Sequence, residues 1–133
     1  MKIIDIEGIG PAYAKKLAKS GLRTVEGLLK MGATAKGRKQ IAETSGIDAM
    51  LVLEWVNRAD LYRIKGVGKQ YSDLLEKAGV DTVVELGKRV PANLYKKMVE
   101  VNQAKNLVNG MPGAKQVEGW VEQAKKLPRV VSY

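Results

Sequence analysis

The chain has 133 residues and contains no cysteine and no histidine; its 23 lysines and arginines against 14 acidic residues give a formal charge of +9. This length is enough to bury a hydrophobic core. The composition excludes thiol nucleophiles, disulfides, zinc sites with cysteine or histidine ligands, and histidine-dependent catalytic triads. The excess of positive charge favours a polyanionic partner, nucleic acid before any other.

The expected elements, taken in chain order, are helical except at the two ends. The sequence allows residues 2–4 and 129–131 to pair as a short two-stranded ribbon. Pro11 opens a helix that is closed by Gly21, and Gly79 closes the equivalent helix later in the chain. Thr24 begins the next helix, and Thr82-Val83-Val84-Glu85 is typical of a capping box. Further helices are expected at about residues 36–45, 48–62, 91–105 and 114–126. The predicted fold class is all-α.

An internal repeat organises the chain. The first copy begins Ile6-Glu7-Gly8-Ile9-Gly10-Pro11-Ala12-Tyr13, and the second begins Ile64-Lys65-Gly66-Val67-Gly68-Lys69-Gln70-Tyr71. Apolar and glycine positions continue to match after these segments. We therefore expect a single domain, residues 1–133, made of repeat 1 (about 1–60) and repeat 2 (about 61–133). The two halves are predicted to be pseudo-symmetric and to share one core.

Each half also carries one tryptophan in the pattern Trp-Val-x-x-Ala, at Trp55 and Trp120. We predict that both tryptophans lie in the core and that Tyr13 and Tyr71 pack nearby. No repeat segment follows the helix around Trp120, so we predict that it folds back beside the first copy as the missing leading helix. Deleting residues 114–133 would then unfold the first half. The same pairing between two chains would give a swapped dimer in place of a monomer.

The two segments with alternating glycines are here named glycine turn 1 (residues 6–10) and glycine turn 2 (residues 64–68). Alternating glycines let a tight turn expose backbone N–H groups, and the following helix adds its positive N-terminal end. Such a turn can bind a phosphate without any side chain. The pattern resembles the helix-hairpin-helix motif. That resemblance implies binding to the DNA backbone without sequence preference, and a monovalent cation that bridges turn carbonyls and phosphate.

Nearly the whole chain resembles a bacterial family of unknown function, the domain family numbered 4332. The residues that carry this resemblance are Ile6-Glu7-Gly8-Ile9-Gly10-Pro11, Ala35-Lys36-Gly37-Arg38, Trp55-Val56-Asn57-Arg58-Ala59-Asp60-Leu61, Arg63-Ile64-Lys65-Gly66-Val67-Gly68, Ala78-Gly79-Val80-Asp81-Thr82 and Trp120-Val121-Glu122-Gln123-Ala124-Lys125-Lys126-Leu127. The resemblance implies a tandem helix-hairpin-helix fold. It implies no activity, because the family has no established role.

The candidate DNA-binding residues are those of the turns, the first residues of the following helices, and nearby lysines. They are Gly8, Ile9, Gly10, Ala12, Lys15, Lys16, Lys65, Gly66, Val67, Gly68, Lys69 and Gln70. The second copy departs from the first, since Asp73 stands where Lys15 stands in repeat 1. Phosphate binding is therefore expected more firmly at turn 1. The lysines have an alternative explanation as an ordinary solvated surface.

No arrangement of residues points to catalysis. The acidic residues are scattered without a pair that implies a shared active site. The Gly-x-Gly segments lack the further glycine, preceding strand and downstream acid of a dinucleotide fold. We predict a protein that is not an enzyme and has no resident cofactor. A lysine of lowered pKa beside a turn is the one catalytic alternative.

The predicted function is therefore a non-catalytic nucleic-acid-binding module, with duplex DNA as the first partner. The alternative is a helical protein–protein adaptor whose turns only set helix geometry. The two differ in salt dependence, because phosphate binding weakens steeply as salt rises. We expect no membrane partner, since no apolar run approaches the ~18 residues of a membrane span. The early charges also argue against a signal peptide, so a cytoplasmic location is expected.

Overall fold

The computed structural model describes all of residues 1–133, and its fold is all-α, as predicted. Its only β feature is an isolated bridge between Lys2 and Thr24. The elements in chain order are the 3-10 helix η1 (Ile3–Asp5) and the helices α1 (Pro11–Ala18), α2 (Val25–Met31), α3 (Ala35–Ser45), α4 (Ala49–Leu61), α5 (Lys69–Lys77), α6 (Val83–Gly87), α7 (Pro91–Lys105) and α8 (Ala114–Lys126). The four later helices expected from the sequence are α3, α4, α7 and α8, and their bounds agree closely with the predicted ones.

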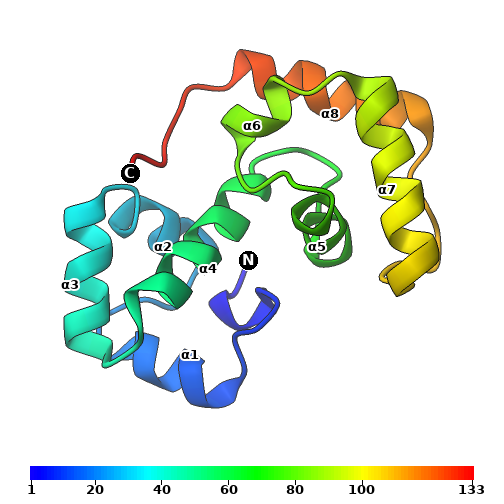
Figure 1. Cartoon of the computed structure of the whole chain (residues 1–133). Helices are drawn as coiled ribbons and strands as arrows, with labels where there is room; N and C mark the ends of the chain where they lie inside the picture. Colours follow the sequence, from blue (N-terminus) through cyan, green and yellow to red (C-terminus); the bar gives the residue numbers. More distant parts are fainter. The chain divides into compact units, whose positions relative to one another are not determined.

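The chain divides into two compact units (Figure 1). Unit 1 consists of Met1–Asp60 together with Val130–Tyr133, and unit 2 consists of Leu61–Arg129. Unit 1 is thus discontinuous in sequence, because unit 2 is inserted before its last four residues. The expectation of one shared core stays a prediction.

Threonine side chains fix the starts of the short helices. The Thr24 hydroxyl accepts a hydrogen bond from the Gly27 N–H at 3.0 Å, and the Thr82 hydroxyl accepts one from the Glu85 N–H at 3.4 Å. These bonds satisfy amides that a helix start leaves without a partner. In the predicted capping box, the Glu85 carboxylate accepts from the N–H of Asp81 (3.2 Å), one residue earlier than the box requires.

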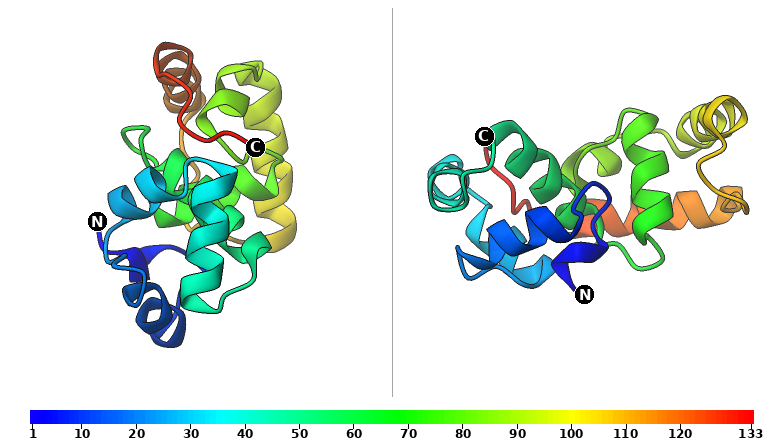
Figure 2. Two further views of the ribbon diagram at one scale, coloured as in Figure 1. Left: turned by 90° about the vertical axis from the view of Figure 1, so that its left-hand side faces the viewer. Right: turned by 90° about the horizontal axis from the view of Figure 1, so that it is seen from below.

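Apolar side chains fill the interior of each unit. In unit 1, α3 packs against α1 and α2, and Leu17, Leu28 and Ile41 are fully buried. In unit 2, α8 packs against α6 and α7, and α7 also packs against α5 (Figure 2). The predicted burial of both tryptophans is confirmed, since Trp55 and Trp120 are each 2% exposed.

The predicted terminal ribbon is wrong. The start of the chain pairs instead with the segment before α2, where the Ile3 N–H donates to the Arg23 carbonyl and the Val25 N–H donates to the Met1 carbonyl, both at 3.0 Å. This pairing is close in sequence. It therefore costs less loop-closure entropy than joining the two ends of the chain.

The C-terminal tail, Val130–Tyr133, folds onto the turn between α2 and α3 (Figures 1 and 2). The Ser132 N–H donates to the Ala33 carbonyl at 2.8 Å, and the Tyr133 hydroxyl lies 3.3 Å from the Asn57 carbonyl oxygen Oδ1. The buried Arg38 donates through Nη2 to the Ser132 carbonyl (2.7 Å) and through Nη1 to the Gly32 carbonyl (2.9 Å). Burial lowers the pKa of the Arg38 guanidinium, and Tyr133 offsets part of that effect.

The predicted fold-back of the Trp120 helix onto the first copy is also wrong. Helix α8 belongs to unit 2, where Trp120 packs against Tyr71 with ring centroids 5.4 Å apart. The helix beside the first copy is α4, whose Trp55 lies 5.1 Å from Tyr13. Each copy is thus completed by the helix that follows it in the chain. The monomer and swapped-dimer alternatives stay predictions.

Candidate functional site

The two glycine turns have the same hydrogen-bonded backbone. In turn 1 the Ile9 N–H donates to the Ile6 carbonyl at 3.1 Å, and in turn 2 the Val67 N–H donates to the Ile64 carbonyl at 3.1 Å. The third residue of these turns has a positive φ, 91° at Gly8 and 94° at Gly66. A turn with positive φ at this position favours glycine, because a side chain would clash with the backbone. The sequence pattern thus corresponds to two equivalent turns.

Each turn leads into a helix whose start has no side-chain cap. Helix α1 is capped at its start by Gly10 and helix α5 by Gly68, and neither cap has a side chain to accept from the first amides of its helix. The exposed donors at turn 1 are the N–H groups of Gly8, Gly10 and Ala12. Their counterparts at turn 2 are the N–H groups of Gly66, Gly68 and Gln70. Such a set of donors at a helix N-terminus suits an anion.

Two of the candidate residues position the turns and offer no donor. Ile9 and Val67 are 3% and 5% exposed, and their amides are used inside the turns. Their side chains anchor each turn to the core of its unit. Of the other candidates, Gly68 is half-buried and the rest are exposed: Gly8, Gly10, Ala12, Lys15, Lys16, Lys65, Gly66, Lys69 and Gln70.

The charges beside the two turns differ. Lys15 and Lys16 are exposed on α1, a helix with no acidic residue, and Lys16 Nζ lies 5.7 Å from the centroid of the Tyr13 ring. Helix α5 carries Lys69 at its start but also Asp73, four residues later and therefore a neighbour on the same face. Turn 1 is thus followed by cationic side chains alone, whereas turn 2 is followed by side chains of both signs.

Turn 2 is also clamped by a side chain that the sequence analysis missed. Gln123 of α8 accepts from the Lys65 N–H through Oε1 (3.0 Å) and donates to the Lys65 carbonyl through Nε2 (3.4 Å). The equivalent place in the Trp-Val-x-x-Ala pattern of α4 holds Arg58. Comparison of the repeats therefore gave no signal for this clamp.

A tryptophan ring lies directly beside each turn. A Cβ atom placed on Gly8 would lie 3.4 Å from Trp55 Nε1, and one placed on Gly66 would lie 3.0 Å from Trp120 Nε1. Tyr13 and Tyr71, half-buried, cover these rings at an interplanar angle of 62° and 49° respectively. A tryptophan and a tyrosine therefore pack beside each turn.

A protein-family model matches residues 7–127, which covers turn 2, all of turn 1 except Ile6, and all eight α-helices. The chain belongs to the family described as Domain of unknown function (DUF4332). No curated protein and no solved structure matches the chain. The resemblance found in the sequence is thus confirmed, and the family's description assigns the DUF4332 protein no activity.

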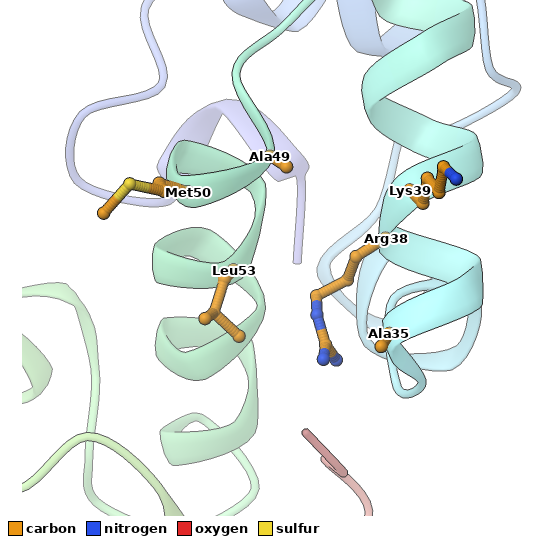
Figure 3. A pocket seen from close by; sticks show the side chains of 6 residues that line it. All are labelled: Ala35, Arg38, Lys39, Ala49, Met50 and Leu53. Atoms are coloured by element: carbon orange, nitrogen blue, oxygen red, sulfur yellow. The ribbon is translucent and has the colours of Figure 1, made fainter.

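Unit 1 of this DUF4332 protein has several surface hollows, and one of about 390 Å³ lies between α3 and α4 (Figure 3). Figure 3 shows the side chains of Arg38 and Leu53 reaching from the two helices into the space between them. Met50, which is 80% exposed, lies at its edge. None of the helices of the protein is both long enough and apolar enough to cross a membrane.

Proposed function

We propose that this protein is a non-catalytic tandem helix-hairpin-helix module that binds the sugar–phosphate backbone of nucleic acid, duplex DNA first. The observation that carries the proposal is the matched set of exposed amides without acceptors at Gly8, Gly10 and Ala12 and at Gly66, Gly68 and Gln70. Backbone amides contact phosphates and carry no sequence information, so the binding is not sequence-specific. A cytoplasmic location, which gives access to nucleic acid, is part of the proposal.

The charge of the helix that follows favours turn 1, whereas within the turns themselves Glu7 of turn 1 stands where turn 2 has Lys65. Lys15 and Lys16 add positive charge one turn into α1, whereas Asp73 replaces it on α5. The formal charge of +9 adds a long-range attraction to a polyanion. Each phosphate that a lysine neutralises contributes a slope of about −0.9 to the dependence of log K on log salt.

The test is fluorescence anisotropy with a labelled DNA duplex over a salt series, comparing the wild type with Gly10→Val/Gly68→Val. A Cβ at either glycine meets nothing within 4 Å, and φ is −87° at Gly10 and −106° at Gly68, so valine fits the fold and covers the amides. Gly113→Val is the matched control. Gly113 also caps a helix start, has open space around its Cβ, and lies outside both turns.

We expect the double variant to lose duplex binding while Gly113→Val retains it, with both proteins folded. The loss follows because the valine side chains occupy the space in front of the turn amides. Binding that survives the double variant would mean that the lysines act as a diffuse charged surface. That result would contradict the proposal.

A charge-matched pair of variants separates local from diffuse electrostatics. Lys15→Glu/Lys16→Glu and Lys96→Glu/Lys97→Glu change the net charge equally, but only the first pair lies beside a turn. We expect the first pair to weaken binding far more at a given salt concentration. Equal weakening would point to the net charge alone.

The second candidate function is a helical protein–protein adaptor. The observation that favours it is the hollow between α3 and α4, with the exposed Met50 at its edge. Binding through such an apolar surface would change little with salt. Absence of duplex binding even at low salt would favour this candidate over nucleic-acid binding.

A further inference from the structure

The indole N–H groups of Trp55 and Trp120 are donors whose acceptor lies outside the protein. Both rings are 2% exposed, and neither indole nitrogen has a hydrogen-bond acceptor within the chain. Neither nitrogen is among the fully buried side-chain atoms that lack a hydrogen-bond partner. Buried tryptophan N–H groups usually find a partner. For these two the available partner is solvent, which a ligand bound at the turn can replace.

Both nitrogens lie against the exposed glycine of a turn. They are 3.4 Å (Trp55) and 3.0 Å (Trp120) from the place where a Cβ on Gly8 or Gly66 would lie. The missing side chain therefore leaves each indole N–H beside the turn amides that have no acceptor. At turn 2 the side-chain nitrogen of Gln116 lies 3.7 Å from the same Cβ position and adds a further donor.

We propose that Trp55 and Trp120 each donate their indole N–H to an oxygen of the phosphate held by the adjacent glycine turn. The inference rests on the proposed function and adds a side-chain donor to a site otherwise made of backbone. The indole N–H can only donate, so it matches a phosphate oxygen, which only accepts. Because the indole is uncharged, its contribution leaves the salt dependence of binding unchanged.

The direct test is a ¹⁵N–¹H correlation spectrum of the protein titrated with a short DNA duplex at low salt. The chain has two tryptophans and thus two indole signals, which Trp55→Phe and Trp120→Phe assign. We expect both indole protons to shift downfield and to saturate with the same affinity as the amides of Gly8 and Gly66. Shifts of the glycine amides without the indoles would overturn this inference and leave the proposed function standing. Failure of the duplex to bind at all would overturn both.

A second measurement removes the donor and keeps the shape of the ring. Incorporation of benzothienylalanine in place of tryptophan substitutes sulfur for the indole N–H, so the packing against Tyr13 and Tyr71 is preserved. We expect duplex affinity to fall about tenfold for each of the two hydrogen bonds removed, the size of a hydrogen bond to a charged group, with an unchanged slope of log K on log salt. An unfolding midpoint equal to that of the wild type is the control for folding. Unchanged affinity in this folded protein would overturn the inference.

Discussion

At the scale of single residues, the two glycines of each turn have different tasks. Gly8 and Gly66 adopt a positive φ, which side chains resist, and each lies against a tryptophan nitrogen. Gly10 and Gly68 have an extended backbone with open space in front of them. The first glycine of each turn is therefore required by the fold, and the second leaves room for a ligand.

This division predicts that alanine destabilises the protein more at the first glycine of a turn than at the second. Gly8→Ala and Gly66→Ala are expected to lower the free energy of unfolding by about 1–2 kcal/mol, the cost of a side chain in the left-handed region. The loss is expected to be greater at Gly66, where the added Cβ would lie only 3.0 Å from Trp120 Nε1. Gly10→Ala and Gly68→Ala are the matched controls and should change stability much less. Urea denaturation measures all four, and an equal loss at Gly10 would contradict the distinction.

At the scale of elements, the short helices depend on their first turns. Helix α2 has seven residues and α6 has five, too few to be stable without packing and caps. The Thr24 hydroxyl is the cap of α2 and the Thr82 hydroxyl is the cap of α6. Thr82 is 4% exposed, whereas Thr24 is exposed, so water can replace only the Thr24 cap easily.

Removal of the Thr82 cap should therefore be more destabilising than removal of the Thr24 cap. We expect Thr24→Ala to cost about 1 kcal/mol and Thr82→Ala to approach about 2 kcal/mol, because a half-buried Glu85 N–H would lose its acceptor. Amide hydrogen exchange in α2 and α6, with circular dichroism for global unfolding, measures both. Thr24→Ser and Thr82→Ser keep the hydroxyl and should stay near the wild type. A smaller loss of unfolding free energy for Thr82→Ala than for Thr24→Ala would contradict this prediction.

The helices themselves could be predicted from the sequence, but their partners could not. Pro91, Gly21 and Thr82 mark helix ends through local backbone chemistry, which depends only on neighbouring residues. Trp120 and Trp55 occupy equivalent positions in the repeats, and the sequence around them does not predict which turn each ring packs against. That choice depends on contacts between distant parts of the chain, and the sequence prediction of it was wrong.

Prediction of the candidate site from the sequence was limited in the same way. The exposed glycines and lysines of the turns follow from the repeat, because exposure and backbone conformation are local. The clamp of Gln123 on Lys65 and the approach of Trp55 to Gly8 required α8 and α4 to be placed first. The sequence therefore predicted the backbone of the site and missed the side chains that reach it from other helices.

At the scale of the whole molecule, unit 1 is completed by the last four residues of the described chain. Val131 is 3% exposed, and Ser132 supplies the carbonyl to which the buried Arg38 donates at 2.7 Å. Arg38 also donates to carbonyls of the α2–α3 turn. The buried Val131 side chain and the charge-assisted bond from Arg38 thus add to the backbone bond from Ser132 to Ala33 in closing unit 1.

Removal of residues 130–133 is therefore expected to destabilise unit 1 by about 3 kcal/mol, the sum of a buried valine and a hydrogen bond to a charged group. Hydrogen exchange resolved by residue should show faster opening in α2 and α3 and little change in α7 and α8. The conservative Ser132→Ala variant keeps the backbone carbonyl and serves as the control. Equal destabilisation of both units would be at odds with the division of the chain.

The insertion of unit 2 into unit 1 also sets an order of events during synthesis on the ribosome. Leu61–Arg129 is continuous, so unit 2 can fold as soon as its own residues have emerged. Unit 1 emerges first but remains incomplete until Val130–Tyr133 have been synthesised. Until then Arg38 lacks the Ser132 carbonyl as a hydrogen-bond acceptor. The part of the chain that is made first is therefore the part that finishes folding last.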